Sequence, residues 1–225
     1  FGTAENRRIE KHTLDAARNN INLLSFISVE RIQSEITRIL ISDYPAESLR
    51  VLNSIGGLEI ILPEAIPSVG FEQNEFHIHD VWEHTLWVLE RTPKDLMLRL
   101  SALFHDLGKP ASFSVGEDKR RHFYEHEVIG EQIAKEVMER LKYSNRLTED
   151  VSKIVKLHMR PMDCGPAGVR RLMRDLGDLF PEWRKFKYAD LPPALGEGDF
   201  DHKAERFDQM VADEIQRQLT TGKKN

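Results

Sequence analysis

A histidine followed directly by an aspartate, His105-Asp106, is the feature of this sequence best suited to chemistry. The pair follows a largely apolar run, 98–104, so both polar side chains are expected to be buried. Burying a carboxylate is costly unless a cation or several hydrogen-bond donors meet it. Because other histidines and acids of the chain could converge on this pair, the cation that we expect is a metal ion.

Three further histidines are expected to face the interior. His84 shares a helix face with apolar residues three and four positions away, and His158 ends an apolar stripe of helical spacing. His126 lies directly before the helix predicted over residues 127–141. A single inward histidine is more often a hydrogen-bonded core residue than a ligand. Three of them together with a buried His-Asp pair favour a shared metal site instead.

The spacing alone leaves the remaining acidic ligand open. Asp80 lies one turn before His84 and could support that ring through a hydrogen bond. Asp163 and Asp190 both lie downstream, and either could supply a distant carboxylate.

Helical periodicity dominates the sequence and no sustained alternation of apolar and polar residues occurs, which predicts an all-α fold. A helical section over residues 1–62, a Pro-, Gly- and Ser-containing linker over 63–74, and a main domain over 75–225 that ends in a helix are expected. The helices predicted in the main domain span residues 80–91, 93–106, 127–141, 148–160, 167–176, 181–190 and 201–219.

The composition of the 225 residues is that of an ordinary globular protein, with 40% hydrophobic and 31% charged residues. No apolar run approaches the ~20 residues that cross a bilayer. A net charge of -5 argues against wholesale coating of nucleic acid. The single cysteine, Cys164, fits a reducing, cytoplasmic setting. Because the chain begins at Phe1 within helical sequence, we expect it to be a piece of a longer protein.

The order His84, His105-Asp106, Asp190 resembles the HD phosphohydrolase superfamily, and His126 and His158 take the places of two further histidines found in its two-metal members. More narrowly, the chain resembles the C-terminal half of bacterial tRNA nucleotidyltransferases and related poly(A) polymerases. The stretches that carry this resemblance are 9–16, 27–32, 80–86, 105–110, 122–127 and 169–172.

The resemblance implies an HD helical bundle preceded by a neck- or body-like helical section, and a metal-dependent phosphohydrolase that acts on nucleotide phosphomonoesters or 2′,3′-cyclic phosphodiesters. It implies that His84, His105, Asp106 and Asp190 hold one divalent ion and that His126 and His158 complete a second, which Asp106 bridges. Imidazole and carboxylate ligands suit Mn, Fe, Co, Ni or Zn, with Mg also admitted. Asp106 and Lys109 are the expected catalytic residues. The expected substrate contacts are Lys109, Arg170 and Arg171. Lys109 could equally stabilise the end of its helix through its positive charge.

The alternative function is an RNA-binding and oligomerisation module, in which Arg31, Arg38 and Arg50 lie near a tRNA backbone. A third reading is a di-iron oxygenase, because some HD proteins use the same six ligands with iron. The resemblance does not include a nucleotide-adding head, so this chain alone is not expected to add nucleotides. The expected partners are a nucleotide or phosphoester substrate, tRNA, and either a second copy of the chain or an upstream nucleotidyltransferase domain. No membrane is expected among them.

Overall fold

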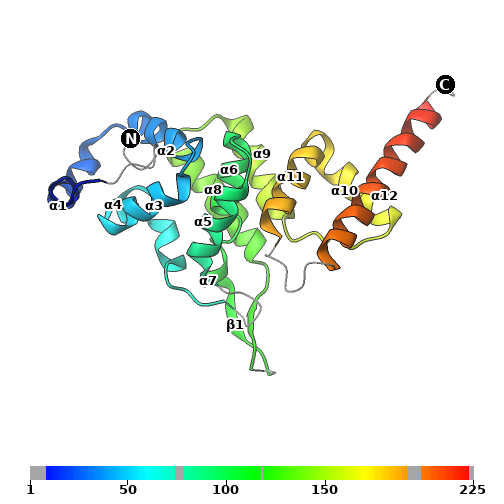
Figure 1. Ribbon diagram of the computed structural model, residues 1–225, viewed down its shortest axis with the longest axis horizontal. Coiled ribbons are helices and arrows are strands. Elements are labelled where there is room, and N and C mark those ends of the chain that lie inside the picture. Colours follow the sequence, from blue (N-terminus) through cyan, green and yellow to red (C-terminus); the bar gives the residue numbers. More distant parts are fainter. Residues whose placement is uncertain (1–8, 74–78, 118, 192–198, 223–225) are drawn as a thin grey trace. The chain divides into compact units, whose positions relative to one another are not determined.

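The computed structural model describes residues 9–73, 79–117, 119–191 and 199–222, and these residues are predominantly helical (Figure 1). The predicted all-α fold class is confirmed, with one small addition, a two-stranded antiparallel sheet. The chain divides into two compact units, Phe1–His158 and Met159–Asn225, which are described in turn. Among the described residues, no helix combines the length and apolar character needed to cross a membrane.

The first unit begins with short helices that lie against a longer bundle. Its N-terminal elements are α1 (Lys11–Asn19), η2 (Ile21–Phe26), α2 (Val29–Leu40), α3 (Pro45–Ser54), α4 (Gly57–Ile61) and η3 (Pro63–Ser68). The segment 63–74, predicted as a linker, therefore contains the 3-10 helix η3, which buries Ala65 and Ser68. The domain boundary placed there stays a prediction.

The bundle of the first unit surrounds α6 (Leu96–Phe104), which packs against α5 (Val81–Arg91), α8 (His126–Arg140) and α9 (Asn145–Leu157) (Figure 1). Every residue of α6 from Leu98 onward is buried. The helix therefore has no solvated face, as expected for a largely apolar helix at the centre of a bundle.

A buried arginine joins the bundle to the N-terminal helices. The guanidinium of Arg99, on α6, donates to the backbone carbonyls of Leu40, Ser42 and Thr92. Only 3% of Arg99 is exposed, and burial lowers the pKa of its guanidinium. These bonds supply donors for carbonyls at or just beyond the C-terminal ends of α2 and α5, where intrahelical partners are missing.

A short hairpin lies between α7 and α8 in the chain. After the single-turn helix α7 (Lys109–Ser112), strands β1 (Phe113–Val115) and β2 (Arg121–Phe123) pair in antiparallel fashion, with Phe113 opposite Phe123. The sequence pattern predicts no strand in this segment. The hairpin ends directly before α8 and so sets where that helix begins.

The second unit consists of α10 (Pro166–Leu176), η4 (Gly177–Leu179), α11 (Phe180–Asp190) and α12 (Asp199–Gly222). Its core is aromatic: Phe180, Trp183 and Phe207 lie with ring centroids 6.2 to 6.4 Å apart. These contacts join α11 to α12, and α10 packs against α12 as well.

Candidate metal centre

The His-Asp pair lies in a tight turn at the carboxyl end of α6. The backbone N–H of His105 donates to the carbonyl of Ser101 (3.0 Å), so the pair continues the helical path for one more turn. His105 is 1% exposed and Asp106 is 2% exposed. The apolar helix therefore carries a carboxylate into the interior of the first unit, as the sequence predicted.

Four histidine rings direct their Nε2 atoms at the two carboxylate oxygens of Asp106. Oδ2 lies 3.6 Å from Nε2 of His84 and 3.2 Å from Nε2 of His105. Oδ1 lies 3.4 Å from Nε2 of His126 and 3.7 Å from Nε2 of His158. The carboxylate thus faces one pair of rings with each oxygen.

The backbone fixes the orientation of three of these rings. Nδ1 of His105 lies 2.8 Å from the carbonyl oxygen of Ala102. The corresponding distances are 2.7 Å from His126 to Phe123 and 2.6 Å from His158 to Val155. A carbonyl oxygen only accepts, so each Nδ1 carries the proton. In the neutral ring, the lone pair on Nε2 then points at Asp106, the arrangement that metal-binding histidines use.

The donor set fits a divalent metal ion. Asp106, His126 and His158 each offer one atom within 4.8 Å of the other two. The Nε2 atoms of His126 and His158 lie only 3.2 Å apart. With both Nδ1 atoms protonated, two neutral rings bring lone pair against lone pair, which favours a cation between them. Imidazole with carboxylate suits a first-row transition metal better than Ca²⁺.

Lys109 completes the charge balance around Asp106. Its Nζ donates to Oδ2 of Asp106 (2.6 Å) and to Oε1 of Gln73 (2.6 Å), and it is 7% exposed. Burial alone raises the pKa of a carboxyl group, but His105 in its protonated form, the charge of Lys109, and hydrogen bonds that the protonated rings of His105 and His126 donate outweigh it. The pKa of Asp106 is therefore held well below its usual range.

Within the first unit, the structure brings together five predicted ligands and Lys109. Asp190, the sixth, is the last residue of α11 in the second unit, where its carboxylate lies 3.9 Å from Nζ of Lys187. Arg170 and Arg171 lie on α10 of the same unit. The ligand role of Asp190 and the substrate contacts of the two arginines stay predictions, as does metal binding itself.

Asp80 differs from the expectation that it supports His84. Its Oδ1 accepts from the backbone N–H of Glu83 (2.7 Å), and its Oδ2 accepts from that of Gly70 (3.1 Å). The side chain therefore caps the N-terminus of α5, which is the common role of an aspartate at this position. His84 instead stacks on Trp87, with ring centroids 6.0 Å apart.

Gln73 is a site residue that sequence reasoning missed. It is 7% exposed, accepts from Lys109 and donates from Nε2 to the backbone carbonyl of His79 (3.2 Å). It thereby holds the ammonium group of Lys109 beside Asp106. A glutamine in a segment rich in turn residues gives no signal of burial, so only the fold reveals this role.

Comparison with known proteins agrees with this geometry. The sequence model of the HD domain matches residues 76–190, half of the chain, and the chain belongs to the HD domain family. A second family, described as "Probable RNA and SrmB- binding site of polymerase A", matches residues 8–68.

Three curated relatives illustrate where similar sequences occur. The chain is 32% identical to the A-adding tRNA nucleotidyltransferase of Deinococcus radiodurans, over 84% of this chain and 44% of that protein. It is 32% identical to the CC-adding tRNA nucleotidyltransferase of Thermus thermophilus, over 86% of this chain and 46% of that protein. A multifunctional CCA protein of Pseudomonas fluorescens is 36% identical over 53% of this chain and 30% of its own length. The chain therefore spans less than half the length of these relatives.

Proposed function

We propose that the chain is a metal-dependent phosphohydrolase acting on nucleotide phosphomonoesters or 2′,3′-cyclic phosphodiesters. The observation that carries this proposal is the buried Asp106 carboxylate, which faces two imidazole nitrogens with each of its oxygens. Membership of the HD domain family supports the metal, and the names of the relatives support a substrate related to RNA ends.

The chain's own residues divide into two ligand sets that share Asp106. His84, His105 and Oδ2 of Asp106 form one set, which we propose that Asp190 completes. His126, His158 and Oδ1 of Asp106 form the other. Ions held there would be Mn, Fe, Co, Ni, Zn or Mg. Such a pair would lower the pKa of a water and stabilise charge at phosphorus.

Lys109 is the protein group best placed to act on a phosphate directly. Its ammonium lies between Asp106 and Gln73, so a phosphate oxygen at the centre would find a charged donor already oriented. The backbone bonds to Nδ1 of His105, His126 and His158 keep these rings from turning when the substrate enters. Both features limit the reorganisation that the site needs during the reaction.

The decisive experiment compares wild type with Asp106→Ala. Metal content is measured on the purified proteins, and turnover is measured on p-nitrophenyl phosphate and on 2′,3′-cyclic AMP. The substitution removes the carboxylate shared by both ligand sets, so metal content and hydrolysis are expected to fall together. Asp15→Asn, which changes an exposed carboxylate paired with Arg18 on α1, is the matched control and is expected to keep both.

Full metal-dependent hydrolysis by Asp106→Ala contradicts the proposal. Iron content with oxygen consumption and no hydrolysis points to the di-iron oxygenase reading.

A second candidate function, a tRNA-binding module, is favoured by the match of residues 8–68 to an RNA-binding family. Of the three arginines expected near RNA, Arg31 is exposed and Arg38 is exposed but paired with Glu35 (3.1 Å). Arg50 donates to both carboxylate oxygens of Glu83, at 2.7 Å to Oε2 and 3.3 Å to Oε1, so its charge is already neutralised within the fold. A salt-sensitive shift of tRNA without hydrolysis of either phosphoester would favour this function.

A further inference from the structure

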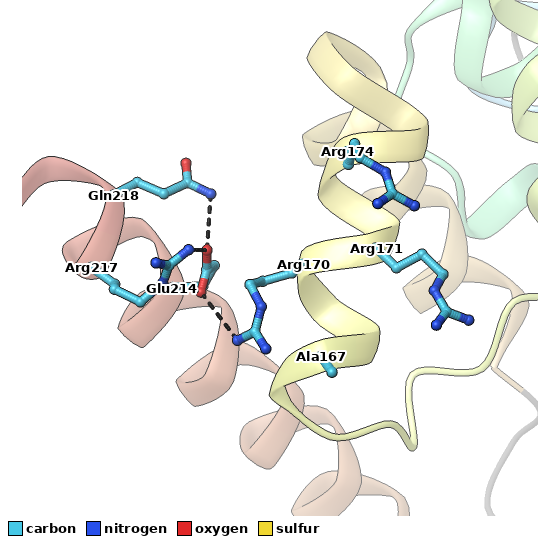
Figure 2. A pocket seen from close by; sticks show the side chains of 7 residues that line it. All are labelled: Ala167, Arg170, Arg171, Arg174, Glu214, Arg217 and Gln218. Atoms are coloured by element: carbon cyan, nitrogen blue, oxygen red, sulfur yellow. Dashed lines mark hydrogen bonds and ion pairs between the residues drawn. The ribbon is translucent and has the colours of Figure 1, made fainter. Parts of the chain in front are cut away.

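The second unit contains a pocket that lies outside the ligand sets of the proposed metal centre. It has a volume of about 410 Å³ and lies between α10 and α12 (Figure 2). Its lining residues are Ala167, Arg170, Arg171, Arg174, Glu214, Arg217 and Gln218. The lining thus contains four guanidinium groups and one carboxylate, in a chain whose net charge is -5. The local excess of positive charge runs against the overall composition.

Glu214 holds two of these arginines in place. Arg217 donates to both carboxylate oxygens, at 2.8 Å from Nε to Oε2 and 2.6 Å from Nη2 to Oε1. Arg170 reaches across from α10 and places Nη1 3.7 Å from Oε2, as Figure 2 shows. Glu214 is 4% exposed, and hydrogen bonds from Arg217 outweigh the effect of burial and lower its pKa to about 2. Glu214 is therefore a positioning residue: its carboxylate stays ionised and fixes the guanidinium groups of Arg170 and Arg217.

The other two arginines keep more of their charge available. In Figure 2, Arg171 extends from α10 on the side opposite Glu214, and Arg174 lies about one turn further along that helix. The side chain of Arg174 is 75% exposed, and its only ion pair among the described residues is with the adjacent Asp175 (3.2 Å). Within the same described part of the chain, no ion pair engages Arg171. Two fixed and two exposed guanidinium groups therefore line one open pocket.

From this arrangement we infer that the pocket between α10 and α12 binds phosphate groups of an RNA backbone. Guanidinium groups bind phosphate oxygens through paired hydrogen bonds and remain charged at any working pH. Arginines from two helices, spread along an open pocket, suit successive phosphates of a polymer better than one small anion. Residues 8–68 match an RNA-binding family, and the relatives are named for tRNA, so RNA is the polyanion that the chain is most suited to meet. The pocket lies outside that matched segment.

The test measures binding of a fluorescent tRNA transcript to the 225-residue chain by anisotropy over a range of salt concentrations. Arg171→Gln/Arg174→Gln removes two charges that Glu214 does not hold. Each lost phosphate contact reduces the slope of log K against log[salt] by about 0.7–0.9. We expect the double variant to bind about five- to tenfold more weakly, with a slope smaller by about 1–2. Arg146→Gln/Lys185→Gln, which removes two exposed charges elsewhere, is the matched control and is expected to stay within about twofold of wild type.

Three results decide the inference. An unchanged dissociation constant and slope in Arg171→Gln/Arg174→Gln overturn it. Calorimetric binding of inorganic phosphate to wild type, lost in the double variant while tRNA binding is kept, also overturns it and identifies a small-anion site. Weaker tRNA binding by Glu214→Gln, measured at a temperature at which circular dichroism shows that the variant is folded, supports it. Asp106→Asn removes the proposed hydrolysis and leaves tRNA affinity in place, so failure of one proposal is visible separately from failure of the other.

Discussion

Gly108 lies so close to His126 that the fold has no room for a side chain there. A β-carbon at Gly108 would lie 2.2 Å from the carbonyl oxygen of His126 and 2.8 Å from the backbone nitrogen of Gly130. The turn that carries His105 and Asp106 therefore packs directly against the first turns of α8. This close approach brings the His-Asp pair and His126 into one centre.

We predict that Gly108→Ala destabilises the first unit and disturbs the ligand set together. Both atoms that the new methyl group meets are backbone, so α8 must shift, which costs about 1–3 kcal/mol or more in the free energy of unfolding. Urea denaturation and metal analysis measure the two effects. At Gly165 a β-carbon meets nothing within 4 Å, so Gly165→Ala is the control and is expected to cost at most about 1 kcal/mol, through its N-cap position. Full stability and metal content in Gly108→Ala would show that the contact is unimportant.

Much of the fold could be predicted because its signals are local. The apolar helix faces that carry His84 and His158 predict that those rings point inward, and the apolar run before His105 predicts burial of the His-Asp pair. Helix boundaries were less accurate. Asp95 and Ser144 cap α6 and α9, so these helices begin at Leu96 and Asn145 rather than at the predicted residues 93 and 148.

The features that were missed depend on residues far apart in the chain. Gln73 acquires its role only because the fold carries it to Lys109, 36 positions away. The hairpin was hidden because its strands are only three residues long, too short for an alternating pattern to register. Asp80 lies three residues before Glu83, whose N–H it caps, and four residues before His84, so its position in the sequence fits both roles. Only coordinates distinguish a carboxylate that faces the backbone from one that faces a ring.

Removal of metal is expected to lower the thermal stability of the first unit. A ligand that binds only the folded state at 100 times its dissociation constant contributes about 2.7 kcal/mol. For a chain of this size, that corresponds to about 5–10 °C in melting temperature. Scanning calorimetry with and without a chelator measures the shift. His158→Asn is expected to reduce the shift strongly, whereas His202→Asn, at a side chain that is 82% exposed, is expected to keep it. Equal melting temperatures of wild type with and without chelator contradict a resident ion.

Replacement of Arg99 by methionine is expected to loosen the contact between α6 and the N-terminal helices. The substitution keeps the apolar stem but leaves the carbonyls of Leu40, Ser42 and Thr92 without the guanidinium donors. Buried acceptors without partners cost about 1–3 kcal/mol each, and partial relaxation makes a total loss of about 2–4 kcal/mol our expectation. Urea denaturation measures it. Arg38→Met, at a side chain that is 60% exposed on α2, is the control, expected within about 0.5 kcal/mol of wild type. Equal losses in the two variants would show that the buried bonds add nothing.

The stability of the second unit is expected to depend on acid through Glu214. Its pKa is about 2 in the folded chain, below its ordinary value of 4.5, because Arg217, Gln218 and Arg170 stabilise the carboxylate. The unfolded chain therefore binds a proton first as pH falls, so this stabilisation is present in full above about pH 5 and declines toward pH 2. Glu214→Gln lacks the charge and is expected to be less stable than wild type above about pH 5, with the difference shrinking between about pH 4.5 and pH 3. Denaturation at a series of pH values measures this difference.

Glu205→Gln, at a side chain of α12 that is 77% exposed, is the control, and its effect on the free energy of unfolding is expected to stay within about 0.5 kcal/mol. If the gap between wild type and Glu214→Gln is constant across this range, Glu214 does not hold the arginines through its charge.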